Sequence, residues 1–169
     1  MSSLYKAEPV TRVFESAGYA RIEPEILQPA DIFLDLSGEE IRHRLLLTSD
    51  GEGRELALRP EFTIPVARAF LSDPSRSEAG FSYYGPVFRA RQGEATEFTQ
   101  AGIESFGRMD AEAADAEILA RAVEALHAAD ETSNDIRLGD MGLFTALLDA
   151  LALPAVLQRR LRRAFAKGA

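Results

Sequence analysis

The feature that most constrains the fold is a pair of strand-like segments, residues 81–91 and 96–106, separated by a short loop that contains Gly93. Two such segments joined by a glycine-containing loop are typical of a β-hairpin. Side chains alternate between the two faces of a strand. The second strand therefore places five residues on one face, namely Phe98, Gln100, Gly102, Glu104 and Phe106.

Polar groups on this hairpin predict a ligand site. A turn centred in the middle of the loop would place Arg89 opposite Gln100, and Gly85 opposite Glu104. This register is a conjecture, because a slip of one residue reverses a face. Gly85 and Gly102 would leave gaps beside the polar groups, with an open notch at Gly102. A guanidinium, an amide and a carboxylate suit an amino-acid ligand, but an ordinary solvent-exposed sheet face stays an alternative.

A second polar cluster lies in residues 58–68, where a strand ends at Arg59 and a helix begins near Thr63. Glu61 and Thr63 fall in the turn between them. One interpretation is helix capping, with Thr63 as the N-cap residue and Pro65 tolerated in the first turn. The alternative is that both polar groups face the sheet and contribute to the same site as the hairpin.

The remaining pattern predicts an α+β domain, with an antiparallel sheet flanked by helices, over residues 1–169. Strands are expected mainly in the middle of the chain and helices at its ends. The expected helices are 4–17, 63–71, 111–129, 142–151 and 155–166. The further expected strands are 19–22, 44–48, 55–59 and 134–138.

Composition narrows the function. The chain has no cysteine and two histidines, His43 and His127, so neither a metal site nor a cofactor is expected. It shows no signal peptide and no membrane span, and a cytoplasmic location is expected. The net charge of −8 argues against general nucleic-acid binding. Residues 155–169 nonetheless contain several basic residues and no acidic residue. This segment is interpreted either as the solvated face of a helix or as a contact for an anionic partner.

Both polar clusters resemble the class II aminoacyl-tRNA synthetase core, in its histidine branch. Residues 59–63, Arg-Pro-Glu-Phe-Thr, are similar to that branch's Arg-Pro-Glu-Gly-Thr amino-acid loop. Residues 83–107 are similar to its motif 2, and residues 4–24 to motif 1, which implies a homodimer through this region. The resemblance implies a histidine-like pocket formed by Glu61, Thr63, Arg89, Gln100 and Glu104. It also matches Arg89 to the arginine that contacts the ATP α-phosphate.

The departures from the synthetases predict that aminoacylation is lost. Arg91 stands where synthetases carry a glutamate in Phe-Arg-x-Glu, and Phe62 replaces a glycine. The motif 2 loop is short and, over residues 92–96, has no basic residue. Motif 3, with its second ATP arginine, and an anticodon-binding domain find no counterpart in these residues. Adenylation needs cations placed on the developing phosphate charge, and this set is incomplete.

This combination resembles the regulatory subunit of ATP phosphoribosyltransferase, a synthetase-like family without aminoacylation, and the chain resembles only its N-terminal part. The resemblance implies a non-catalytic partner that activates the short-form catalytic subunit. It also implies histidine feedback on the first step of histidine biosynthesis. The alternatives are a fragment of a histidine-tRNA synthetase and a binding module that uses the basic terminal helix. Weak or undetectable histidine binding is expected for this chain alone, and stronger binding for the full complex.

Overall fold

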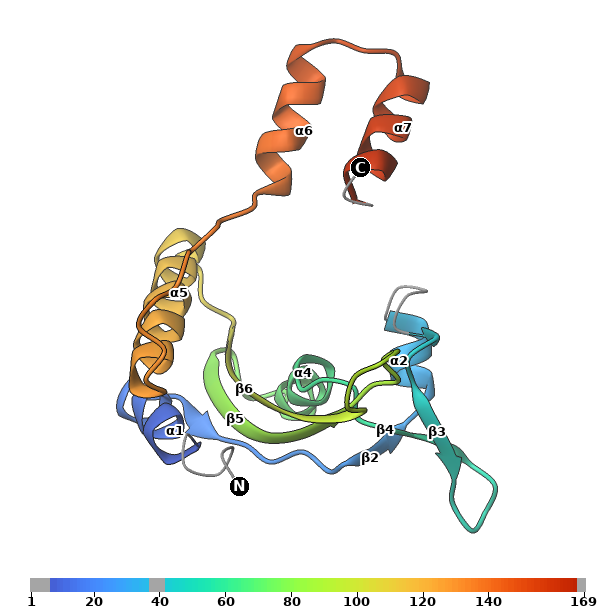
Figure 1. Cartoon of the computed structure of the whole chain (residues 1–169), viewed down its shortest axis with the longest axis vertical. Coiled ribbons are helices and arrows are strands. Elements are labelled where there is room, and N and C mark those ends of the chain that lie inside the picture. Colours follow the sequence, from blue (N-terminus) through green and yellow to red (C-terminus); the bar gives the residue numbers. More distant parts are fainter. Residues whose placement is uncertain (1–6, 37–41, 167–169) are drawn as a thin grey trace. The chain divides into compact units, whose positions relative to one another are not determined.

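The computed structural model describes residues 7–36 and 42–166 (Figure 1). The chain consists of two compact units, residues 1–132 and 133–169. The first unit contains both polar clusters. The second is a helical hairpin. The expectation that residues 1–169 form one partial synthetase-like domain stays a prediction.

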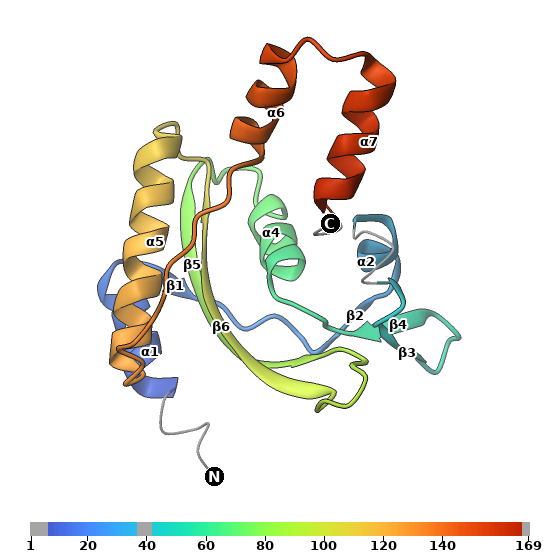
Figure 2. The ribbon, with the colours of Figure 1, turned by 45° about the horizontal axis from the view of Figure 1, so that its top comes forward.

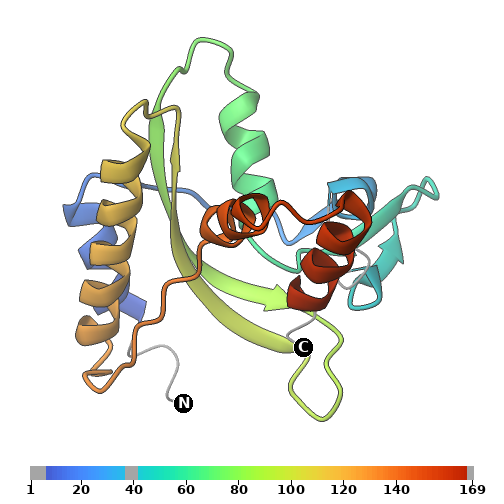
Figure 3. The same ribbon diagram turned by 90° about the horizontal axis from the view of Figure 1, so that it is seen from above.

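The main sheet of the first unit has the strand order β1-β5-β6. β5 (Ala79–Phe88) and β6 (Glu97–Phe106) are antiparallel, and the two-residue β1 (Ala20–Arg21) adds to β5 in parallel. β5 and β6 form a long curved ribbon in Figures 2 and 3. The hairpin and the α+β fold class predicted from the sequence are confirmed, with one short parallel strand added.

The predicted register of this hairpin is wrong by four residues. Gly85 pairs with Gln100, and Phe81 pairs with Glu104. β5 ends at Phe88, so the connection to β6 is longer than the predicted loop. Because the shift is an even number of residues, each side chain keeps the face that the alternation predicted.

Each face of this sheet packs against helices. α4 (Thr63–Leu71) lies along the concave side of the ribbon (Figure 3). Val66 of α4 and Phe62, which directly precedes the helix, pack with Phe81, Tyr83 and Val87 in one buried cluster. Two helices, α1 (Ala7–Ser16) and α5 (Ala111–Ala128), cover the other face and contact one another.

The α1 and α5 side of the sheet is mainly apolar. Val10 and Phe14 of α1 pack with Tyr19 and with Ala125 of α5. α1 ends before Gly18, whose φ of +90° is a conformation that glycine adopts without a Cβ penalty. The Tyr19 hydroxyl then donates to Glu117 Oε1 of α5 at 3.2 Å, which fixes the start of β1 against this helix.

A smaller antiparallel sheet has the order β2-β4-β3. It consists of β2 (Leu27–Pro29), β4 (Glu55–Leu58) and β3 (Leu46–Ser49). α2 (Asp31–Leu36) follows β2, and its Phe33 packs with Ala30 and Ala57 in a separate buried cluster. β4 leads directly into the turn before α4, so this sheet determines where the polar turn begins.

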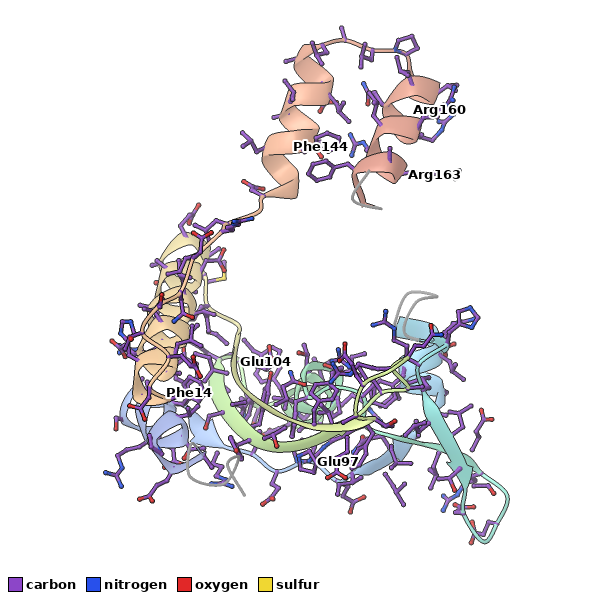
Figure 4. The ribbon with its side chains drawn as sticks, viewed as in Figure 1. Phe14, Glu97, Glu104, Phe144, Arg160 and Arg163 are labelled. Atoms are coloured by element: carbon purple, nitrogen blue, oxygen red, sulfur yellow. The ribbon has the colours of Figure 1, made fainter. Side chains whose placement is uncertain are left out.

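The second unit is formed by α6 (Met141–Ala150) and α7 (Ala155–Ala166). The Asp140 carboxylate caps α6 by accepting the Gly142 N–H at 2.6 Å. Phe144 and Phe165 stack with ring centroids 4.1 Å apart, and Figure 4 shows Phe144 pointing toward α7. The exposed Arg160 and Arg163 point away from α6 in the same view.

Most of the predicted helices and strands are present, with ends shifted by at most three residues. The predicted helix at 4–17 corresponds to α1, and its first three positions lie outside the described residues. The predicted strand at 134–138 is wrong, because these residues pair with no other strand of the described chain. β2 and α2 were not predicted.

Candidate functional site

A cluster of polar side chains, here called the acidic cluster, joins the start of α4 to the middle of β6. It consists of Glu61, Thr63, Gln100 and Glu104. The Thr63 hydroxyl donates to Glu104 Oε1 at 2.7 Å, which links the helix to the strand. Figure 4 shows Glu104 on the α4 side of the ribbon and Glu97 on the opposite side.

Tyr83 on β5 connects Gln100 and Glu104 of this cluster. Its hydroxyl donates to Glu104 Oε1 at 3.3 Å and accepts from Gln100 Nε2 at 3.5 Å. Burial raises the pKa of Tyr83 well above its usual range, and the nearby Glu104 carboxylate raises it further. Tyr83 therefore stays protonated and acts as a donor. Gln100 Oε1 is buried and has no hydrogen-bond partner among the described residues.

Glu61 occupies the turn before α4. Its Oε1 accepts the Ile64 N–H at 3.0 Å and its Oε2 lies 3.3 Å from the same nitrogen. Burial raises the pKa of this carboxyl and Glu104 adds to the rise, whereas the hydrogen bonds from Ile64 and Thr63 oppose it. Neither Glu61 nor Glu104 forms an ion pair within the described part of the chain. Two carboxylates thus approach one another without a neutralising cation.

The capping prediction for Thr63 is wrong. Phe62 is the N-cap residue of α4 and Thr63 is the first residue of the helix. Glu61 supplies the acceptor for a free helix N–H instead, which a carboxylate at a helix N-terminus does favourably. The Thr63 hydroxyl is consequently available for Glu104, as the alternative interpretation of this turn required.

The two glycine gaps on this face are filled by the chain itself, contrary to the open notch predicted at Gly102. A Cβ on Gly102 would lie 2.6 Å from Cζ of Tyr83. A Cβ on Gly85 would lie 2.9 Å from Nη2 of Arg59 and 3.2 Å from Cζ of Phe62. The glycines therefore let large side chains lie flat on the strands.

Phe62, Tyr83 and Arg59 form a stack beside the acidic cluster. The Phe62 and Tyr83 rings are nearly parallel with centroids 4.4 Å apart, and the Arg59 guanidinium lies 4.1 Å from the Phe62 centroid. Arg59 is buried, and its Nε donates to the Pro86 carbonyl at 2.9 Å. The stack fixes Tyr83 and fills the space that a glycine at position 62 would leave open.

The structure brings four of the five predicted site residues into the acidic cluster and leaves Arg89 apart from it. Arg89 follows the end of β5, and its Nε donates to the Pro60 carbonyl at 2.6 Å. Its guanidinium lies 5.4 Å from the centroid of Phe98. Arg89 therefore holds the turn that carries Glu61. The assignment of these five residues as a histidine-like pocket stays a prediction.

Arg91 belongs to a second group of charges at the tip of the hairpin, here called the arginine cluster and consisting of Arg44, Arg89 and Arg91. The Arg91 guanidinium lies 4.1 Å from the Phe98 centroid and forms an ion pair with Glu94. The Arg44 carbonyl accepts the Ala90 N–H at 2.8 Å, which places Arg44 beside this tip. This region is basic where the resemblance places a glutamate in the synthetases.

The acidic cluster offers acceptors to a small ligand that carries N–H groups. Two carboxylate groups and an unpaired amide oxygen suit an ammonium or a protonated imidazole. Within the described residues, no group of three or more His, Cys, Asp and Glu residues could hold a metal ion. No helix among them is long and apolar enough to cross a membrane.

Sequence reasoning missed Tyr83, which contacts Gln100 and Glu104. Its signal was a large aromatic residue facing a glycine across paired strands. That pairing, Tyr83 with Gly102, is visible only in the correct register.

The curved antiparallel hairpin, the helix beneath it and the acidic cluster define a class II synthetase-like core. A family model described as histidyl-tRNA synthetase matches residues 6–169. The chain belongs to this family.

The curated and structural relatives carry two kinds of name. The chain is 44% identical over 160 residues to the ATP phosphoribosyltransferase regulatory subunit of Mesorhizobium japonicum. The aligned region covers 94% of this chain and 43% of that protein. It superimposes with a TM-score of 0.83 and 28% identity on an ATP phosphoribosyltransferase regulatory subunit/histidyl-tRNA synthetase from Bacillus halodurans, over 96% of this chain and 43% of the other. A histidine-tRNA ligase subunit from Alicyclobacillus acidocaldarius gives a TM-score of 0.66 at 29% identity, over 94% and 48%.

The predicted resemblance to the regulatory subunit is thus confirmed at the level of sequence and fold. The chain spans less than half the length of these relatives.

Proposed function

We propose that this chain contributes to a non-catalytic regulatory subunit of ATP phosphoribosyltransferase in the cytoplasm. The subunit activates the short-form catalytic subunit and mediates histidine feedback in the first step of histidine biosynthesis. Similarity to curated regulatory subunits supports this role. A homodimer through the region of residues 4–24 is part of the same proposal.

The observation that carries the ligand proposal is the pair of carboxylates, Glu61 and Glu104, joined through Thr63 without a cation. Half-buried carboxylates without a neutralising cation oppose folding, and groups perturbed in this way cluster at functional sites. The α-ammonium and the imidazole N–H of histidine are donors that match Glu61, Glu104 and the Gln100 oxygen.

The observation that supports a non-catalytic role is the state of Arg91. Its guanidinium stacks on Phe98 and pairs with Glu94, so it is directed to the chain's own groups. The family resemblance implies that a synthetase has a glutamate at this position and further arginines that contact the nucleotide. We therefore expect no histidine-dependent exchange between ATP and pyrophosphate.

The experiment that tests this function is a pull-down of the regulatory subunit that contains this chain with the short-form catalytic subunit, with and without histidine. Co-purification together with increased phosphoribosyltransferase activity supports the proposal. Measurable histidine-dependent ATP–pyrophosphate exchange by the purified regulatory subunit would instead favour the alternative, a histidine-tRNA synthetase.

Histidine binding is tested separately by calorimetry. We expect weak or undetectable binding to this chain alone and stronger binding to the complex, because the relatives contain more than twice as much chain around this core. Tight binding by the 169-residue chain alone would contradict this expectation.

A further inference from the structure

The smaller sheet of the first unit carries a hollow that includes no residue of the acidic cluster. It has a volume of about 770 Å³ and is lined by residues of β2, β4 and the start of α2. Its apolar lining includes Leu27 and Leu56, and Leu27 is 46% exposed. The hollow therefore offers an uncovered leucine against which a partner's apolar side chain can pack.

The polar lining of this hollow is predominantly acidic. Its cation, Arg54, is already paired with Asp50. Three further carboxylates of the lining are exposed and form no ion pair among the described residues, namely those of Glu25, Asp31 and Glu55. Charges of one sign around a hollow attract a partner of the opposite charge. The hollow is consequently suited to a basic partner that also brings an apolar side chain.

One side of α7, here called its outward face, has these two properties. It consists of Val156, Arg159, Arg160 and Arg163, whose i, i+3, i+4 and i+7 spacing places them on one side of the helix. Figure 4 shows Arg160 and Arg163 pointing away from α6. Val156 is 61% exposed, and the three arginines are exposed and form no ion pair within the described part of the chain.

The other side of α7 is occupied within the helical hairpin. Phe165 stacks on Phe144, and Arg162 Nη1 donates to Thr145 Oγ1 of α6 at 3.4 Å. The outward face can therefore contact a partner while the hairpin keeps its own contacts.

We propose that the outward face of α7 docks into this hollow on a second copy of the chain. Val156 packs against Leu27, and the three arginines lie opposite the three unpaired carboxylates. Each chain carries both surfaces, so two copies can exchange α7 reciprocally, which gives two contacts in one closed dimer. The contact is small and rich in exposed charges, so it is weak and sensitive to salt. It goes beyond the proposed function, because it requires neither histidine nor the catalytic subunit.

The test is disulfide trapping between two single-cysteine variants, since the unaltered chain has no cysteine. An isotope-labelled Leu27→Cys chain is mixed with an unlabelled Val156→Cys chain under mild oxidation, and mass spectrometry measures the mixed dimer. The matched control replaces the first variant by Leu71→Cys, because Leu71 is 73% exposed on α4 and does not line the hollow. We expect at least fivefold more mixed dimer with Leu27→Cys than with the control.

Charge reversal tests whether the carboxylates and arginines select this contact. Arg160→Glu on the Val156→Cys chain should lower the yield of mixed dimer at least fivefold, and so should Glu55→Arg on the Leu27→Cys chain. Combining both reversals should restore most of the yield, because opposite charges then face one another again. Arg137→Glu makes the same change at an exposed arginine outside α7 and should leave the yield within about twofold. Salt at 1 M should lower the yield, since it shortens the screening length to about 3 Å.

Three results would overturn the proposal. The first is a yield of mixed dimer no higher than in the Leu71→Cys control, and the second is an equal yield after Arg160→Glu. The third is a disulfide within a chain that carries both Leu27→Cys and Val156→Cys, while the mixed chains do not cross-link. That result would show that α7 occupies the hollow of its own chain. Because the trapping uses this chain alone, a failure to bind histidine or the catalytic subunit is a separate outcome.

Discussion

The acidic cluster and the arginine cluster each connect the β5–β6 hairpin to another segment, but they differ in how their charges are satisfied. In the acidic cluster, Glu104 accepts from neutral hydroxyl groups of Thr63 and Tyr83, and no cation of the described chain pairs with it. In the arginine cluster, Arg91 is paired with Glu94 and stacked on Phe98. The comparison shows that, among the described residues, one fold holds carboxylates without a cationic partner at the acidic cluster and a paired, ring-stacked guanidinium at the arginine cluster.

The aromatic stack lies beside the acidic cluster, and removing it should have the largest effect. Phe62→Ala removes a ring that is 1% exposed and stacks on both Tyr83 and Arg59. We expect the free energy of unfolding to fall by about 3–5 kcal/mol, since a cavity replaces the ring. Chemical denaturation measures it. Leu71→Ala on the same helix is the control, because Leu71 is 73% exposed and should change stability by less than about 0.5 kcal/mol.

Gly102 tests whether Tyr83 must lie flat on β6 to build the acidic cluster. Gly102→Ala would place a Cβ 2.6 Å from Cζ of Tyr83 and displace the ring from Glu104. We expect a loss of about 1–3 kcal/mol in the free energy of unfolding, as for other overpacked sites. Gly51→Ala is the matched control, since its Cβ would meet no atom within 4 Å. Equal stability of the two variants would contradict the packing role of Gly102.

Two tyrosines on opposite faces of the sheet allow a sharper comparison. Tyr83→Phe removes a hydrogen bond to Glu104, and Tyr19→Phe removes one to Glu117. Each change should lower the free energy of unfolding by about 1 kcal/mol. Only Tyr83→Phe should also weaken histidine binding by the regulatory complex, because only Tyr83 contacts the acidic cluster. A similar loss of histidine affinity in both variants would show that the effect is structural.

The smallest effect concerns the ionisation of Glu61. Burial raises the pKa of Glu61 in the folded chain, so the charged form opposes folding at neutral pH. This contribution to stability is most favourable below the ordinary glutamate pKa of about 4.3, and it is lost as the pH rises through the folded pKa. Glu61→Gln should therefore be more stable than the unaltered chain at pH 7, and the difference should shrink toward pH 4. Thermal unfolding across this range measures it, and a difference that grows at low pH would contradict the assignment.

Local sequence patterns predicted the elements that depend on local chemistry. The apolar spacing of residues 111–129 predicted α5, and the alternation on either side of Gly93 predicted the hairpin. The expected strands at 44–48 and 55–59 correspond to β3 and β4, and the break between them was predicted correctly. These features require only neighbouring residues to be considered together.

The failures involve contacts between distant residues. The register depends on where β5 ends, and the sequence does not show that Arg89 leaves the strand to contact Pro60. Thr63 has the chemistry of an N-cap residue, but Glu104, distant in sequence, accepts its hydroxyl instead. Gly102 predicted a gap, and the tyrosine that fills it comes from the partner strand. In each case the sequence suggested a local explanation, whereas a contact between distant residues determines the structure.

The central claim is that the acidic cluster recognises histidine while Arg91 of the arginine cluster takes no part in that recognition. Calorimetric titration of histidine into the complex of the regulatory and catalytic subunits tests it most directly, with Glu104→Gln and Arg91→Gln compared in parallel. The account predicts that Glu104→Gln weakens histidine binding at least tenfold and that Arg91→Gln leaves it within about twofold of the unaltered complex. Unchanged affinity after Glu104→Gln, or an equal loss in both variants, would contradict it.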